Sequence, residues 1–205
     1  VIGCIQKEHP YVAVIPVLTQ LQEWLQAISV SWFHEEDETS HTIVNAIEEY
    51  CRTLTDRLIS DRKLNQDMKV QIEKCIEKIQ VLVEDKADLL TDKIIKAEVY
   101  GLSNELFACC LRQQGLRAQT LDTGKFMQIN LERKPDIPYI KESVQQYISE
   151  KRDADIFIAP LSLCKNVYGE TDFMNEKRND YYATVLATAF GADELLLSTQ
   201  INHIY

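Results

Sequence analysis

The chain lacks an excess of positive charge, which narrows the partners that it can bind. It has 22 Lys and Arg residues against 32 Asp and Glu residues, a formal net charge of −10. Nucleic acids and anionic membranes are bound by basic patches, so the composition disfavours both as partners. A small anionic ligand is not excluded, because it needs only a local positive site.

The sequence also lacks a long apolar run and a secretory leader. No stretch of apolar residues is long enough to cross a bilayer, and the chain shows no signal peptide. Its six cysteines match neither the spacing of a zinc site nor a CxxC redox pair. We therefore expect no metal site, and reduced thiols in a cytoplasmic protein, with several cysteines on buried helix faces. The adjacent Cys109 and Cys110 keep a redox role open, although neighbouring side chains on a helix point in different directions.

The residues that are present are sufficient for a folded core. Apolar residues make up 45% of the chain and charged residues 26%, a balance that disfavours wholesale disorder. A length of 205 residues corresponds to one α/β domain, or to one domain with an appendage. The sequence contains no internal repeat.

The first half of the chain has the pattern of one strand followed by helices. The β-branched run Tyr11–Pro16 predicts a buried strand, preceded by the end of a helix over residues 1–8. From about Leu18 to Gln114 the apolar residues recur with a helical period. The side chains predicted to line the inner faces of the first three helices are Leu21, Trp24, Leu25 and Ile28, then Ile43, Ile47, Tyr50, Leu54 and Leu58, then Val70, Cys75, Ile79, Leu82 and Val83.

Capping residues predict where these helices begin and end. Ser40 is expected to cap the second helix, after an acidic stretch over residues 35–38 that we predict to be a solvated loop. Thr91 or Asp92 is expected to start the fourth helix. Gly115 suits the position just after its end, where the backbone often adopts a left-handed conformation.

The second half alternates between strands and helices, which predicts a mainly parallel sheet with helices on its faces. The predicted strands span residues 117–121, 126–130, 155–159 and 194–199, and the predicted helices span 138–151 and 180–190. Between them, Glu170 and Asp172 are either an acid/base pair or, with Gly169, part of a polar turn.

Motifs along almost the whole chain resemble, in the same order, those of aspartokinases. The corresponding segments are Val12–Val17 for the family's VVVSA strand, Val99–Ser103 for its GExxS helix, Leu121–Asp122 for its LD strand, Glu176–Ala183 for its GRGGSDYTA loop and helix, and Ser198–Tyr205 for its WTDVDGIYT strand and turn. The segment 166–172 resembles the lead-in to the glycine loop.

This resemblance implies the α/β amino-acid kinase (carbamate kinase-like) fold, with a long helical insertion in a mainly parallel sheet. Residues 1–205 would form one such domain, incomplete at both ends, with a helical part over 18–114 and a nucleotide-side αβ part over 115–205. The family phosphorylates L-aspartate with ATP and Mg in amino-acid biosynthesis and is typically dimeric, so a homodimer is implied. In the family a regulatory domain follows this point, and a homoserine dehydrogenase is sometimes fused.

The resemblance also implies roles for single residues. Asp180 would be catalytic, Lys177, Arg178, Thr199 and Tyr205 would bind nucleotide, and Ser103 and Asp122 would bind substrate. Several of these residues also have a purely structural interpretation. Asp180 also suits a first-turn acid that the helix dipole favours, Lys177 and Arg178 suit a solvated loop, and Tyr205 suits packing against the sheet edge.

Several family motifs are replaced in this chain. Lys177 and Arg178 stand where the family has the loop glycines, Val99-Tyr100 replaces its GE, and Thr199-Gln200 replaces its TD. Phosphoryl transfer depends on positioning and charge neutralisation, so these changes together predict weak or lost activity. One hypothesis is therefore a binding or regulatory module. The alternatives are an active divergent aspartate kinase that uses a Lys/Gly-Gly segment before Val1, and a structural role for the helical part as a dimer surface.

Overall fold

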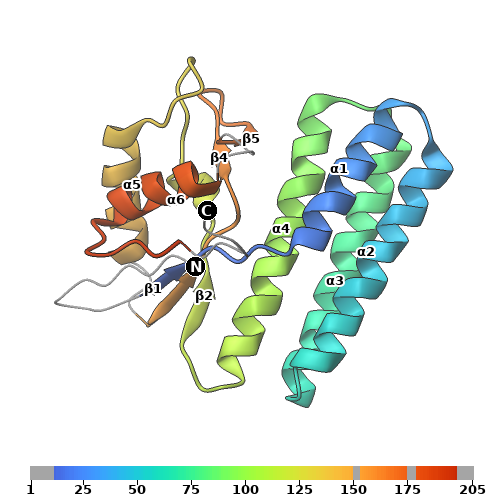
Figure 1. Cartoon of the computed structure of the whole chain (residues 1–205), viewed down its shortest axis with the longest axis horizontal. Helices are drawn as coiled ribbons and strands as arrows, with labels where there is room; N and C mark the ends of the chain where they lie inside the picture. The colour runs from blue at the N-terminus through green and yellow to red at the C-terminus, as the bar shows by residue number, and fades with distance from the viewer. Residues whose placement is uncertain (1–11, 150–152, 175–178, 198–205) are drawn as a thin grey trace, which may run out of the picture.

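The computed structural model describes residues 12–149, 153–174 and 179–197, and it places a bundle of long helices beside a smaller αβ half (Figure 1). The elements are β1 (Val12–Val14), α1 (Thr19–Phe33), α2 (Asp37–Leu58), α3 (Arg62–Glu84), α4 (Leu89–Arg112), β2 (Ala118–Thr120), the 3-10 turn η1 (Thr123–Lys125), α5 (Ile137–Ser149), β3 (Ile156–Ile158), β4 (Leu163–Lys165), β5 (Thr171–Phe173) and α6 (Asn179–Phe190). None of the helices in these residues is both long and apolar enough to span a membrane.

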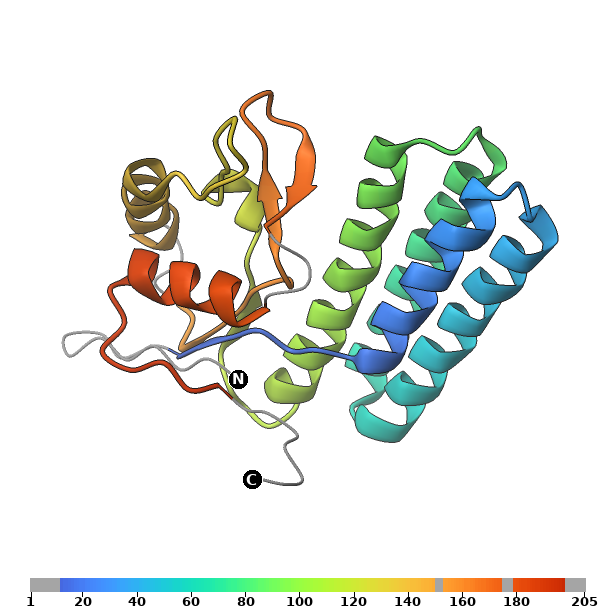
Figure 2. The ribbon, with the colours of Figure 1, turned by 45° about the horizontal axis from the view of Figure 1, so that its top comes forward.

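The αβ half is built on a three-stranded parallel sheet in the order β1-β3-β2. Because side chains alternate along a strand, β3 contributes to two cores. Phe157 packs into the core formed with α5 and α6, whereas Ile158 packs with Ala108 of α4 and Ala118 of β2. The sheet thus lies between α4 on one face and α5 with α6 on the other (Figure 2). The predicted α/β architecture with a parallel sheet is confirmed.

The helical half is a bundle of α1 to α4 around its own apolar core. Leu21, Leu25 and Ile28 face this core as predicted, and Trp32 at the end of α1 donates a hydrogen bond of 3.1 Å to the Asp85 carbonyl. The prediction that Leu58 and Val70 face the core is wrong, since Leu58 is 50% exposed and Val70 is 39% exposed. The buried stripe of α2 instead runs through Val44, Ile47, Cys51 and Thr55.

The cysteines of the described residues are free thiols. Cys51, Cys75, Cys109 and Cys164 are buried and Cys110 is half-buried. Burial raises the pKa of Cys51, Cys75 and Cys164 to about 12. These thiols therefore stay protonated near neutral pH and act as small apolar groups rather than nucleophiles.

The structure corrects the beginnings of two helices. α2 starts at Asp37, so the predicted acidic loop is partly helical and Ser40 is not a cap. Ser40 is fully buried inside α2 and shares a hydrogen bond of 2.9 Å with Ser31. The cap of α4 is Asp88, whose carboxylate accepts from the backbone N–H groups of Leu90 and Thr91, so a start at Thr91 or Asp92 is wrong. An aspartate in extended backbone just before the helix serves this role better than a residue already inside it.

The predicted end of α4 is confirmed. Gly115 has φ of 80°, the Gly115 N–H donates to Arg112, and the Leu116 N–H donates to Leu111. These two hydrogen bonds form a Schellman motif, in which the left-handed residue satisfies the last helical carbonyls.

Two predicted strands of the second half are corrected. Residues 126–130 form isolated bridges rather than a strand, because the chain first turns through η1 and then pairs Gln128 with Lys165. Residues 194–197 are not a strand, and the rest of that predicted strand lies outside the described residues. The antiparallel hairpin of β4 and β5 was not predicted from the sequence.

Candidate functional site

The carboxyl edge of the parallel sheet is the candidate functional site. There β1 leads into Ile15–Pro16, β3 into Ala159–Pro160 and β2 into Leu121–Asp122. In open parallel sheets, ligands bind outside the carboxyl ends of the strands.

Helix α4 brings buried polar residues to the same edge. It runs opposite to β2, and the Thr120 hydroxyl at the end of β2 donates a hydrogen bond of 3.3 Å to the Glu105 carboxylate. Ser103 and Asn104 precede Glu105, so they lie just beyond the end of the strand. They are only 5% and 3% exposed, which is unusual for polar side chains on a helix.

The carbonyl of Leu163 joins the segments that surround this edge. It accepts hydrogen bonds from the hydroxyls of Thr123, at 3.0 Å, and Tyr182, at 3.4 Å. Thr123 directly follows Asp122, and Tyr182 lies in the same first turns of α6 as Asp180. The structure therefore brings the segments of Asp122 and Asp180 to Leu163. Burial raises the pKa of Tyr182, so its phenol remains a hydrogen-bond donor rather than a base.

Asp122 is exposed and takes part in local contacts. Its backbone N–H donates to the Tyr147 hydroxyl at 2.9 Å, and its carboxylate lies 3.8 Å from the Lys125 ammonium. A Cβ added to Gly124 would stand 3.3 Å from the Asp122 carboxylate and 3.1 Å from Cε of Lys165. Gly124 thus allows a close approach of the carboxylate and a lysine side chain.

Asp180 lies in the first turn of α6, is exposed, and accepts a hydrogen bond from the Thr184 hydroxyl through its carbonyl. A carboxylate in this position is favoured by the helix dipole, with or without a catalytic role. The other predicted nucleotide-binding residues, Lys177, Arg178, Thr199 and Tyr205, lie outside the described residues.

Two buried polar atoms at this edge have no hydrogen-bond partner within the described part of the chain. They are Oγ of Ser162 and Oδ1 of Asn179, the first residue of α6. Ser162 is 1% exposed and has φ of 55°, a left-handed backbone that is uncommon outside glycine. Buried polar atoms are normally paired, and strained backbone gathers at functional sites. The described residues therefore leave two buried polar atoms without a partner beside the carboxyl edge.

The place of the replaced GE motif is filled by apolar packing. Val99 is fully buried in the bundle core. The Tyr100 ring packs edge-on against Phe173 of β5, with ring centroids 5.9 Å apart, and contacts both large cores. A carboxylate in either position would have to displace these contacts.

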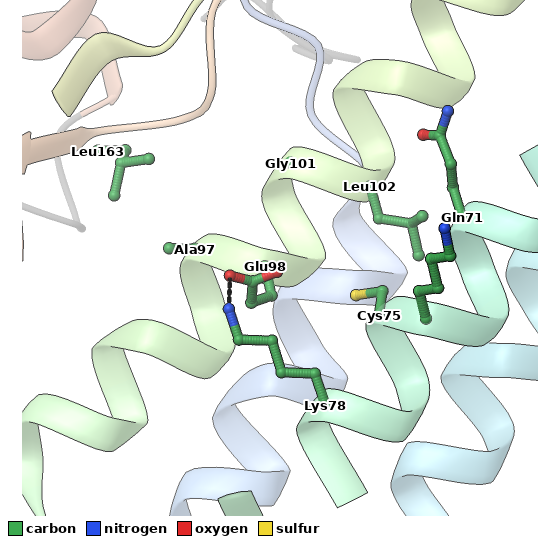
Figure 3. A pocket seen from close by; sticks show the side chains of 9 residues that line it. Gln71, Cys75, Lys78, Ala97, Glu98, Gly101, Leu102 and Leu163 are labelled. Carbon is green, nitrogen blue, oxygen red and sulfur yellow. Dashed lines mark hydrogen bonds and ion pairs between the residues drawn. The ribbon is translucent and has the colours of Figure 1, made fainter. Parts of the chain in front are cut away.

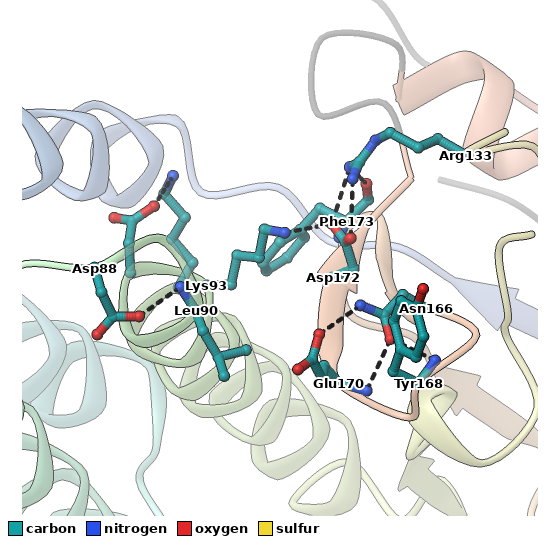
Figure 4. A network of polar contacts seen from close by, with 11 residues as sticks. Asp88, Leu90, Lys93, Arg133, Asn166, Tyr168, Glu170, Asp172 and Phe173 are labelled. Atoms are coloured by element: carbon teal, nitrogen blue, oxygen red, sulfur yellow. Dashed lines mark hydrogen bonds and ion pairs between the residues drawn. The ribbon is translucent and has the colours of Figure 1, made fainter. Parts of the chain in front are cut away.

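The carboxylate of Asp172 is buried, which corrects the expectation of a polar turn at this residue. Asp172 is 2% exposed and lies between Lys93 of α4, at 3.0 Å, and Arg133, which donates two hydrogen bonds of 3.0 Å (Figure 4). Burial alone would raise the pKa of Asp172, but the hydrogen bonds from Arg133, the Phe173 N–H and Lys93 outweigh it and lower that pKa. Asp172 is thus a neutralised anion that joins the two halves, and it is unsuited to proton transfer. Glu170 lies in the turn, as expected, and accepts from Asn166.

The structure adds Asn104, Gly124 and Ser162 to the residues expected at this edge. The sequence carries no local signal for Ser162, because its burial and left-handed backbone arise only when β3, the hairpin and α6 come together. Among the described residues, no group of three or more His, Cys, Asp or Glu side chains is placed to hold a metal ion.

The architecture and its edge site define an amino-acid kinase fold, and the sequence comparison points to aspartokinases within it. No protein-family model matches the chain. It is 28% identical over 144 residues to lysine-sensitive aspartokinase 3 of Escherichia coli strain K12, an alignment that covers 66% of the chain and 31% of that protein. The chain therefore spans about a third of the length of this curated relative.

Solved aspartokinase structures share the fold. E. coli aspartokinase III with aspartate and ADP, in the R-state, has a TM-score of 0.72 at 21% identity, covering 88% of this chain and 40% of that one. The same enzyme with lysine and aspartate, in the T-state, has a TM-score of 0.72 at 22% identity over 82% and 38%. Clostridium acetobutylicum aspartate kinase has a TM-score of 0.64 at 12% identity over 88% and 39%. The predicted amino-acid kinase fold and the resemblance to a divergent aspartokinase are confirmed.

Proposed function

We propose that the chain is an aspartokinase-like domain that binds a small amino-acid ligand at the carboxyl edge of its sheet but transfers phosphoryl groups weakly or not at all. The relatives include structures with aspartate and ADP, which supports ligands of these classes. The observation that carries the loss of activity is the apolar packing of Val99 and Tyr100 at the replaced GE motif.

The charges at the edge also fit poorly with ATP and Mg. Asp122 already lies near Lys125, and Asp172 is neutralised by two cations. Lys177 and Arg178 would have to supply the neutralisation that amides supply in a glycine loop.

Retained binding is supported by the unpaired acceptors Ser162 Oγ and Asn179 Oδ1. The ammonium group of an amino acid carries three donors, which suits two buried acceptors at one edge. In this proposal Ser103 and Asp122 lie near the same ligand. Asp180 lies on the side of the site where a nucleotide would bind.

The activity test uses the protein at its full natural length, with ATP, Mg and L-aspartate. Loss of one transition-state donor alone costs about 10²- to 10³-fold in enzymes of other classes, so several losses together should lower turnover at least about 10³-fold. Acyl-phosphate formation, trapped as the hydroxamate, is measured beside E. coli aspartokinase III. Calorimetric titration measures whether L-aspartate still binds.

Ser162→Ala serves as the binding variant and Ser149→Ala, an exposed serine at the end of α5, as its matched control. Ser162→Ala should weaken aspartate binding about tenfold, the scale of one hydrogen bond to a charged group, and Ser149→Ala should not. Turnover close to that of the E. coli enzyme, abolished by Asp180→Ala, would instead establish the active divergent kinase.

A homodimer is the second proposal. Figure 1 shows that α1 and α3 end, and α4 begins, at the same end of the bundle. The exposed apolar residues in the last turns of α1 and α3 and the first turn of α4 are Val30, Phe33, Val81, Leu89 and Leu90. An apolar group of this kind on a bundle end suits burial against a second copy. Light scattering should give a dimer mass, and Val81→Glu with Leu89→Glu should give a monomer. A monomer for the unaltered protein at high concentration would contradict the proposal.

A further inference from the structure

An open groove with a volume of about 520 Å³ lies between α3 and α4, and Leu163 of the hairpin lines one side of it (Figure 3). This volume falls within the range of small-molecule sites. The groove is separate from the unpaired acceptors at the carboxyl edge, although Leu163 borders both regions.

The polar side of this groove carries positive charge. Lys74 and Lys78 lie four residues apart on α3 and therefore on one face, and Gln71 precedes Lys74 by one turn. Lys78 reaches across to Glu98 of α4 at 2.6 Å, as Figure 3 shows. Within the ranges that the structure describes, Lys74 forms no ion pair, so its ammonium group is available to an anion. With Lys78 paired to Glu98, the charged residues that line the groove leave an excess of one positive charge, on Lys74, which suits an anion with a single charge.

The opposite side of the groove is apolar, and the space above Gly101 is open. Buried Cys75 and Leu102 form its floor, and Leu163 lies on the side of Ala97. Burial raises the pKa of Cys75 to about 12, so this thiol stays protonated near neutral pH. It lines the groove as an apolar group and does not act as a nucleophile. A Cβ added to Gly101 of α4 would meet no heavy atom within 4 Å, so the groove is open above the helix at that point.

We propose that this groove binds a small organic anion, a carboxylate carried on an apolar body. The carboxylate accepts hydrogen bonds from Lys74 and Gln71, and Lys78 keeps its pair with Glu98. The apolar body covers Leu102 and Leu163 and passes over Gly101. This ligand class matches the side chains on both sides of the groove. A cation would be repelled by Lys74, and a fully polar anion would gain nothing from contact with Leu102 and Leu163.

The test uses 3-phenylpropionate as the probe, with 3-phenylpropanol as a neutral analogue and 3-phenylpropylammonium as a cationic one. Binding to the isotope-labelled protein is followed by shifts of backbone amide signals. The carboxylate should shift signals of α3, α4 and β4, and bind at least about tenfold more tightly than either analogue. Lys74→Gln should weaken it about tenfold, whereas Lys63→Gln, an exposed lysine of α3 outside the groove, should leave it unchanged.

Gly101→Leu provides a second, steric test. The open space at Gly101 allows the variant to fold, and its side chain should fill the groove and abolish binding. Equal binding of the cationic analogue, shifts located elsewhere, or binding that survives both Lys74→Gln and Gly101→Leu would overturn the proposal. Loss of aspartate binding in Ser162→Ala leaves this result unaffected, so the two proposals can fail separately.

Discussion

Replacing Phe126 by alanine is expected to lower the free energy of unfolding by about 3–5 kcal/mol, the usual cost of deleting a buried phenylalanine ring. Phe126 is fully buried in the αβ core. Its ring lies against Tyr147 of α5, at a centroid distance of 5.2 Å, and against Phe190 of α6, at 6.3 Å. Truncation therefore removes the ring against which both α5 and α6 pack.

Chemical denaturation of Phe126→Ala beside Leu131→Ala would measure this effect. Leu131 lies in the same half and is 76% exposed, so its truncation should change stability by less than about 0.5 kcal/mol. Phe126→Leu keeps most of the volume and should cost clearly less than the alanine variant. Equal stability of all three variants would show that Phe126 does not pack as described.

The second large effect concerns the buried carboxylate of Asp172. Removing both cations, in Lys93→Ala with Arg133→Ala, leaves this carboxylate buried without a counter-charge and should cost about 3 kcal/mol or more. Asp172→Ala should cost less, because the side chains that lose their partner, Arg133 at 62% and Lys93 at 25% exposure, can be solvated. The expected order of stability is therefore wild type, then Asp172→Ala, then the double variant.

Denaturation at several pH values tests the electrostatic part of this argument. Because the pKa of Asp172 is lower in the folded chain than in the unfolded one, its stabilising contribution is complete above the unfolded pKa of about 4 and is lost as the pH falls through the lower folded value. The advantage of the wild type over Asp172→Asn should shrink over that acidic range. Lys134→Ala, which breaks an exposed pair with Glu132, should cost less than about 0.5 kcal/mol. An advantage that is constant with pH would contradict the ion-pair role.

The elements with local sequence signals were the predictable ones. The helical period over 18–114, the helices predicted over 138–151 and 180–190, and Gly115 after α4 each depend on residues within one or two turns. The error at Ser40 has a different origin. Serine suits a cap by its side chain, but Ser40 lies inside α2 and shares a hydrogen bond with Ser31 of α1, a contact between two helices that the residues around Ser40 do not reveal.

The candidate site was less predictable because its parts come from distant segments. The cations that neutralise Asp172 stand on α4 and in the loop before α5, so nothing near Asp172 in the sequence shows that its carboxylate is buried. The hairpin has no clear sequence signal, because β4 and β5 are short and the turn between them resembles the lead-in to a nucleotide loop. Ser103 and Asp122 follow from the resemblance alone. The structure places both at the carboxyl edge, and their roles in ligand binding stay predictions.

The position of the bundle in the chain bears on how the protein folds. β1 precedes α1, but it pairs with β3, which lies beyond the entire bundle and α5. Pairing β1 with β3 in an extended chain would require closure of a very long loop, which is entropically costly and slow. The bundle helices contact their neighbours in sequence, so they can form early from local contacts, and α4 then ends beside β2. We infer that early formation of the bundle shortens the effective loop between β1 and β3 and so lowers the entropic cost of pairing them.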